Sequence, residues 1–118
     1  MTSLNGDLTK ERWFNLSFLE QMANLGSEVG RTIKWKIKDP ERSRCAFESA
    51  LELLDLTIED TKNKKKPKLE ELCRLREILV DYFCFDNIYG SDDEKWNSYF
   101  YGFNYAASLE YTGIISIM

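Results

Sequence analysis

The chain contains no histidine, and this absence excludes most familiar catalytic and metal-binding arrangements. A Ser-His-Asp or Cys-His system needs the imidazole as its general base. Histidine zinc sites and the Glu-x-x-His ligands of di-iron helical bundles need it as a ligand. Walker phosphate-binding loops and dinucleotide glycine patterns are also missing from the sequence. We therefore expect a protein that is not an enzyme, with no catalytic residue, no metal ligand and no cofactor.

Cysteine is scarce, and long apolar runs are absent. The three cysteines, Cys45, Cys73 and Cys84, are odd in number and form no C-x-x-C, so they predict neither a disulfide framework nor a zinc ribbon. We interpret them as reduced, buried thiols. The first ten residues are polar, and no stretch approaches the roughly 18 apolar residues of a membrane span. These features predict a cytoplasmic protein without a membrane partner.

Signals for β-strands are almost absent, and proline is confined to two positions. The sequence shows no period-two alternation, no Asn-Gly hairpin between β-branched runs and no solenoid repeat. Pro40 and Pro67 each stand where a helix would begin, a position that proline favours. The chain is therefore predicted to be all-α.

The composition is sufficient for one folded domain. The chain has 118 residues, of which 43% are hydrophobic and 14% aromatic, so it can bury a core without disulfides. The net charge of −4 makes nucleic acid an unlikely partner, because phosphate contacts need clustered cations. The lysine-rich stretch 62–68 is interpreted as a solvated loop. We expect a single helical domain over 1–118, with 1–7 and 112–118 as flexible or loosely packed ends.

The apolar spacing predicts four helices, at about 8–38, 40–60, 67–83 and 91–110. The last would begin at a Ser91-x-x-Glu94 capping box. The first would carry a seam with spacings of three and four residues, formed by Leu16, Leu19, Ala23, Gly26, Gly30, Ile33 and Ile37. Because the connections are short, neighbouring helices should run in opposite directions. We predict an antiparallel up-down-up-down four-helix bundle.

Arg76 is predicted to project into the apolar face of the third helix, where arginine is almost never buried without a partner. Counting from the loops places three acidic residues and two glycines near its level: Asp55, Glu52, Glu48, Gly26 and Gly30. Each glycine costs roughly 1 kcal/mol against alanine within a helix, so the pair would have to make room for something bulky. Two interpretations stay open, a structural ion pair and a polar core pocket that binds an anion.

Four carboxylates share one side of the second helix: Glu48, Glu52, Asp55 and Glu59. They are interpreted as a solvated flank with one member paired to Arg76. The alternative is a site for Mg²⁺ or Ca²⁺, which prefer oxygen ligands.

Several aromatic residues are predicted to lie outside the core. Tyr101 and Tyr105 are four residues apart and point away from the apolar stripe of the last helix, with Leu109 next along. Trp35 lies on the polar face of the first helix. Exposed aromatic side chains often anchor interfaces. They would either pack against the chain ends or contact another protein, for which a second copy of the chain is our first candidate.

The segment Arg76-Glu77-Ile78-Leu79-Val80-Asp81-Tyr82 resembles the motif of HEPN domains, an arginine followed by four to six residues and a histidine. HEPN domains are small helical bundles, and many are ribonucleases or the toxin partners of nucleotidyltransferase-like antitoxins. Asp81 stands where the motif has histidine, so the catalytic imidazole is missing. The resemblance implies a ligand-binding or degenerate HEPN-like domain, related to nucleic acids or nucleotides, with a pocket around Arg76. Our leading hypothesis remains a non-enzymatic helical interaction protein that forms a homodimer.

Overall fold

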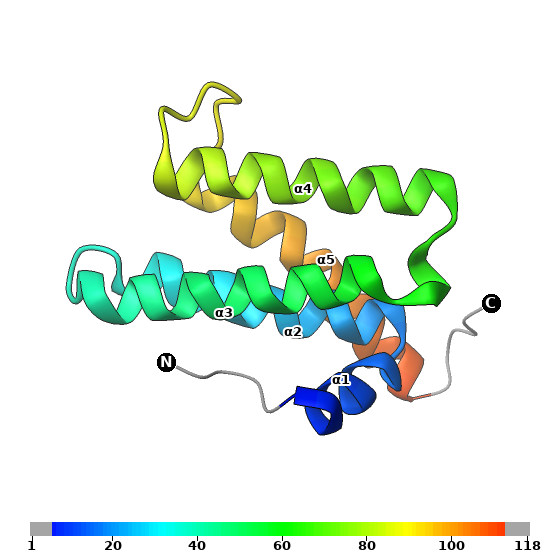
Figure 1. The fold of residues 1–118 in the computed structure, drawn as a ribbon. Helices are drawn as coiled ribbons and strands as arrows, with labels where there is room; N and C mark the ends of the chain where they lie inside the picture. The colour runs from blue at the N-terminus through cyan, green and yellow to red at the C-terminus, as the bar shows by residue number, and fades with distance from the viewer. Residues whose placement is uncertain (1–5, 113–118) are drawn as a thin grey trace.

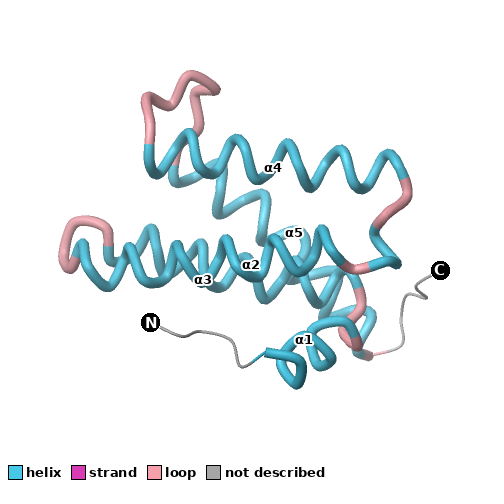
Figure 2. Tube along the Cα trace, in the orientation of Figure 1, coloured by secondary structure: helices cyan, strands magenta, loops and turns pink. Residues whose placement is uncertain are grey.

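The computed structural model describes residues 6–112, and all regular structure within that range is helical. The elements are α1 (Gly6–Phe14), α2 (Phe18–Trp35), α3 (Pro40–Glu59), the 3-10 helix η1 (Thr61–Asn63), α4 (Lys66–Cys84) and α5 (Asp93–Tyr111) (Figure 1). Figure 2 shows only helices and loops over this part of the chain. The all-α prediction is confirmed for these residues. The predicted loose ends lie outside the described residues, except for 6, 7 and 112.

The predicted first helix is in fact two helices, α1 and α2, separated at Ser17. The Ser17 hydroxyl oxygen accepts from the backbone N–H of Glu20 (3.1 Å), and the Glu20 carboxylate accepts from the backbone N–H of Ser17 (3.0 Å). This reciprocal capping box satisfies free N–H groups and starts a new helix. The prediction of one continuous helix was wrong because the Ser17-x-x-Glu20 signal lies within an otherwise continuous apolar pattern.

Helix α1 packs against the end of α3. The indole N–H of Trp13 donates to the Thr57 hydroxyl (3.0 Å), and both side chains are buried. Just beyond α3, the Gln21 side chain donates to the Asp60 carboxylate (2.8 Å) and accepts from Asn63 (2.9 Å). These buried hydrogen bonds tie α1, α2 and η1 together, because unpaired polar groups would be costly there.

The buried face of α2 differs from the predicted seam. Its buried residues are Gln21, Met22, Leu25, Val29 and Thr32. Ile37, the last predicted seam residue, lies beyond the helix and is exposed. The physical reason is that α2 has two neighbours: the Thr32 carbonyl accepts from Ser43 of α3 (2.6 Å), while Gly26 lies against Phe100 of α5. The most buried residues of α2 therefore lie between its contact with α3 and its contact with α5.

The remaining helix ends lie close to their predicted positions. Helix α3 begins at Pro40, where Asp39 accepts from the backbone N–H of Arg42 (3.2 Å) as its N-cap. Helix α4 begins one residue before Pro67. The N-cap of α5 is Asp92, whose carboxylate accepts from the backbone N–H of Lys95 (2.8 Å), so the predicted cap at Ser91 was wrong by one residue. Aspartate caps a helix as well as serine does.

The four longer helices share one apolar core. Its buried members are Met22, Leu25 and Val29 of α2, Phe47, Ala50 and Leu54 of α3, Leu72, Leu75 and Leu79 of α4, and Trp96 and Phe100 of α5. None of the helices in residues 6–112 has an apolar stretch that is long enough to cross a membrane.

The contacts of α2 set the direction of its two neighbours. Helix α3 returns along α2, since Gln21 bonds to Asp60 at one end and Thr32 accepts from Ser43 at the other. Helix α5 also runs opposite to α2, with Glu110 bonded to Ser17 and Asp93 to Lys36. In Figure 1, α5 crosses obliquely behind α2 and α3.

Helix α4 lies along the upper side of the molecule in Figure 1 and reaches its neighbours through long side chains. The Tyr82 hydroxyl donates to Asp93 of α5 (2.6 Å), and the Tyr99 hydroxyl of α5 donates to Glu71 (3.2 Å). Burial and these acidic partners raise the pKa of both Tyr82 and Tyr99, so both hydroxyls remain protonated donors.

Candidate functional site

Arg76 forms an ion pair with Asp55 that bridges α4 and α3. The guanidinium Nε lies 2.7 Å from Oδ1 and Nη2 lies 3.3 Å from Oδ2, a two-point contact. The hydrogen bonds to Asp55 raise the pKa of Arg76. The side chains are 40% and 55% exposed, so the predicted core location of Arg76 was wrong. Its stem starts on the side of α4 that faces α3, but its length carries the charge into water.

The other members of the predicted pocket lie elsewhere. Glu48 pairs with Arg44 on its own helix (3.2 Å), and Glu52 is half-buried on α3. Gly26 accommodates Phe100 of α5, while a Cβ at Gly30 would meet no atom within 4 Å. The structure therefore brings Arg76 and Asp55 together, but the glycines do not make room for that pair.

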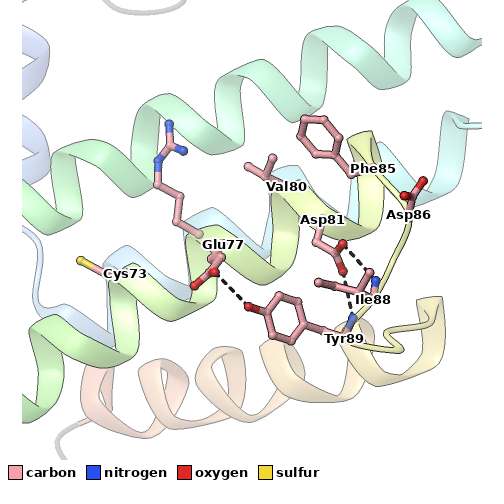
Figure 3. A pocket seen from close by; sticks show the side chains of 9 residues that line it. Cys73, Glu77, Val80, Asp81, Phe85, Asp86, Ile88 and Tyr89 are labelled. Atoms are coloured by element: carbon pink, nitrogen blue, oxygen red, sulfur yellow. Dashed lines mark hydrogen bonds between the residues drawn. The ribbon is translucent and has the colours of Figure 1, made fainter.

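A hollow of about 600 Å³ lies beside Arg76, between α4 and the loop 85–92 (Figure 3). Its lining residues are Cys73, Arg76, Glu77, Val80, Asp81, Phe85, Asp86, Ile88 and Tyr89. Glu77 accepts from the Tyr89 hydroxyl (2.9 Å), and Asp81 accepts from the backbone N–H groups of Ile88 (3.0 Å) and Tyr89 (3.1 Å). Two of its three carboxylates are thus already engaged within the chain.

Asp81 holds the loop 85–92 in place. It is buried, and both its oxygens accept loop N–H groups. Asn87 adopts a positive φ of 56°, which asparagine tolerates, and its side chain bonds to both backbone groups of Ser91. The loop presents Phe85 and Ile88 to solvent, 72% and 79% exposed. At the position where a HEPN motif has histidine, this chain therefore uses a carboxylate to build a loop.

The outer surface of α5 is uncharged over most of its length. No charged residue occurs from Trp96 to Leu109, although 31% of the chain is charged. The exposed residues of this stretch are polar, small or aromatic: Asn97, Ser98, Tyr101, Gly102, Asn104, Tyr105 and Ser108. Tyr101 and Tyr105 are 68% and 58% exposed, and Leu109 beyond them is half-buried. The tyrosines thus point outward, as their spacing indicates.

Helix α2 extends this uncharged surface. Two hollows of about 220 and 410 Å³ run between α2 and α5, lined on the α2 side by Ala23, Asn24, Gly26 and Ser27. The larger hollow is also lined by Glu20, whose carboxylate accepts from the backbone N–H of Ser17. We use the name α2/α5 face for the following set: Ala23, Asn24, Ser27, Asn97, Tyr101, Asn104, Tyr105 and Ser108. The uncharged run on α5 is a signal that the sequence itself carries, from Trp96 to Leu109. Its continuation on α2 depends on how the two helices pack.

The α2/α5 face arises from a close approach of the two helices. A Cβ at Gly26 would lie 2.7 Å from Cβ of Phe100 and 2.9 Å from its Cγ, distances that real atoms do not tolerate. Glycine thus permits a helix contact that any other residue would push apart.

Trp35 does not belong to the α2/α5 face. Its half-buried ring packs under the guanidinium of Arg42 from α3, 4.4 Å from the ring centroid, and near Lys34 at 5.1 Å. Such cation–π contacts stabilise a partly exposed indole within its own chain. The structure therefore separates Trp35 from the two tyrosines with which it was grouped.

Carboxylates and thiols do not gather into a metal site in the described residues, where no three potential ligands converge. On α3, Asp55 and Glu48 each pair with an arginine, and Glu59 lies 3.6 Å from Lys10. The cysteines are free, but Cys73 and Cys84 are exposed, so their predicted burial was wrong.

Tyr101 and Tyr105 differ from Trp35 and Tyr89 in one respect, which they share with the exposed Phe85 of the loop 85–92. Within residues 6–112, neither makes a hydrogen bond, ring contact or cation–π contact, whereas Trp35 stacks with Arg42 and Tyr89 bonds to Glu77. Two tyrosines with no such contact among residues 6–112, on an uncharged surface, make the α2/α5 face our candidate site. Comparison with protein-family models, with curated proteins and with solved structures finds no match to this chain.

Proposed function

We propose that the protein is a non-enzymatic helical interaction protein that forms a cytoplasmic homodimer through the α2/α5 face. The observation that supports this most strongly is the uncharged, exposed stretch of α5 with Tyr101 and Tyr105 at its centre. Tyrosine supplies rigid contact area at a low entropy cost, and serine, glycine and asparagine supply adaptable hydrogen bonds. Interface cores are also depleted in charged residues.

The favoured partner is a second copy of the chain because of the charge pattern. In a two-fold contact, each residue near the axis faces its own counterpart, so a charged residue there would meet a like charge. The chain carries a net charge of −4, so two copies repel each other over most of their surfaces. An uncharged face is where two copies can approach at the lowest electrostatic cost.

We also propose that α2 to α5 form an antiparallel up-down-up-down four-helix bundle, with α1 packed at one end, as a single helical domain. The end-to-end contacts of α2 with α3 and with α5 support this arrangement. The ion pair from Arg76 to Asp55 and the ring contact of Phe47 with Phe83, with centroids 5.1 Å apart, connect α3 and α4. In such a bundle the α2/α5 face is one continuous side.

Sedimentation equilibrium from micromolar to millimolar concentration tests the dimer. The double variant Tyr101→Glu/Tyr105→Glu places like charges in the contact and should weaken dimerisation by at least about thirtyfold, as loss of an interface hot spot does. The matched control is Phe85→Glu/Ile88→Glu, which adds the same charges to exposed aromatic and aliphatic residues of the loop. It should dimerise like the wild type. A monomeric wild type at every concentration would refute the proposal, and so would dissociation of the control alone.

A second candidate function, ligand binding beside Arg76, is supported by the size of the hollow there. Its lining contains Glu77, Asp81 and Asp86 against a single cation, Arg76, which is itself paired with Asp55. This charge balance disfavours nucleotides and nucleic acids, the ligands that a HEPN-like domain would bind. The hollow therefore favours an uncharged or cationic ligand, and we rank it below self-association.

A further inference from the structure

A second cleft lies between α4 and α5, on a different side of α4 from the hollow beside Arg76. Its volume is about 320 Å³, within the range of small-molecule sites. Leu75 and Ile78 of α4 and Trp96 and Tyr99 of α5 form its apolar walls. The cleft exists because these two helices meet through long side chains, such as the Tyr99–Glu71 hydrogen bond (3.2 Å).

The α5 wall of this cleft is formed by aromatic rings that pack on one another. The Trp96 ring stacks on Phe100 with centroids 6.1 Å apart, and Tyr99 meets both rings edge-on. Trp96 is buried, and its indole N–H has no acceptor among residues 6–112. Buried polar groups without a partner are uncommon in native proteins. Aromatic walls of this kind favour a flat or extended apolar ligand.

Two cations border the cleft, one from each helix. Arg74 is exposed and makes no ion pair within the described part of the chain, and the Lys95 ammonium donates only to the Gly90 carbonyl (3.2 Å). The acid in the lining, Glu71, accepts from the Tyr99 hydroxyl. The lining therefore carries a net positive charge in a chain whose total charge is negative.

We propose that this cleft binds a small aromatic or aliphatic carboxylate. The apolar body of the ligand lies between the Leu75–Ile78 wall and the Trp96–Tyr99 wall. Its carboxylate lies at Arg74 and Lys95, where an arginine fork and an ammonium supply charge-assisted hydrogen bonds. The site is separate from the α2/α5 face, so binding does not depend on self-association.

Titration with 4-phenylbutyrate, followed by calorimetry and by backbone amide shifts in NMR, tests this proposal. The acid should bind and shift amides around Ile78 and Lys95, and the neutral probe 4-phenylbutanamide should bind at least about tenfold more weakly. Arg74→Gln/Lys95→Gln should weaken binding of the acid by a similar factor. The control Lys64→Gln/Lys65→Gln removes two exposed lysines beside η1 and should bind like the wild type.

The measurement is best made on the Tyr101→Glu/Tyr105→Glu background, so that dimerisation does not enter the result. Circular dichroism melting confirms that each variant is folded, which is expected because Arg74 and Lys95 are exposed. Equal affinity for the acid and the amide would overturn the proposal. So would unchanged binding in Arg74→Gln/Lys95→Gln, shifts confined to the loop 85–92, or no binding at millimolar acid.

Discussion

The two sides of the molecule are built by different means. Where α5 meets α2, the backbones come close at Gly26 and Phe100, and the exposed residues beside the contact are small, polar or aromatic and carry no charge. Where α5 meets α4, long polar side chains span the distance, as in the Tyr99–Glu71 hydrogen bond, and an apolar cleft remains between the helices. Helix spacing thus shapes the two surfaces: the close pair forms a neutral face, and the separated pair leaves a cleft with apolar walls.

The largest effect is expected from a substitution at the close contact between α2 and α5. Gly26→Ala places a methyl group 2.7 Å from Cβ of Phe100, which is next to the backbone and cannot rotate away. We expect a loss of about 1–3 kcal/mol in the free energy of unfolding, typical of overpacking, measured by urea denaturation. Gly30→Ala is the matched control, because it has open space, and should stabilise by up to about 1 kcal/mol. Equal effects at the two glycines would contradict the close approach.

The next largest effect is expected from a substitution at Asp93, one of the polar residues that connect α4 to its neighbours. Asp93 accepts from the Lys36 ammonium (2.7 Å) and from the Tyr82 hydroxyl (2.6 Å), joining α5, the end of α2 and α4. Burial alone would raise the pKa of Asp93, but these two hydrogen bonds outweigh it and lower the pKa from its usual value. Because the folded pKa is the lower one, the stabilisation is present above the unfolded pKa near 4 and is lost as the pH falls through the folded value.

Asp93→Asn should therefore lower the free energy of unfolding at neutral pH by about 1 kcal/mol, a value that allows for the screening of a partly exposed group. Below a pH of about 5, the free energy of unfolding of this variant should also fall less steeply with decreasing pH than that of the wild type. Asp86→Asn, in the exposed loop, is the control and should follow the wild-type curve. The interpretation fails if urea denaturation from acid to neutral pH gives the same curve for Asp93→Asn and the wild type.

The smallest effect concerns Arg76. Because its ion pair with Asp55 is half in water, Arg76→Met should change the free energy of unfolding by less than about 1 kcal/mol. The methionine retains most of the apolar stem, on the side of α4 that faces α3. The free energy of unfolding is measured by thermal or urea denaturation. If Arg76→Met lowered it by several kcal/mol, the ion pair would be buried, as the helical periodicity predicts.

The sequence predicts most helix boundaries, because they depend on local signals. Pro40 and Pro67 lie at or next to the starts of α3 and α4, and an acidic cap precedes α5. The break at Ser17 also has a local signal, a serine followed three residues later by glutamate, but the apolar periodicity continues across it and masked it. Local rules therefore describe the elements well where two signals do not compete.

The candidate sites depend on packing that periodicity does not give. The position of Arg76 on α4 indicates where its Cβ points, but not that the charge at the end of a long side chain reaches water. Likewise, Tyr101 and Tyr105 could be placed outside the core, whereas Ala23 and Ser27 join their surface only because α2 and α5 pack at Gly26. Trp35 was grouped with them because a helical wheel does not show that Arg42 of α3 covers it.

The most direct test of the α2/α5 face as a self-association surface is an NMR dilution series of the wild-type protein. Backbone amide resonances are followed from dilute to millimolar samples, where a dimer and a monomer exchange. We expect concentration-dependent shifts at Ser27, Tyr101, Asn104 and their neighbours, with the loop 85–92 unchanged. Shifts centred on Phe85 and Ile88, or a spectrum that does not change with concentration, would contradict the proposal.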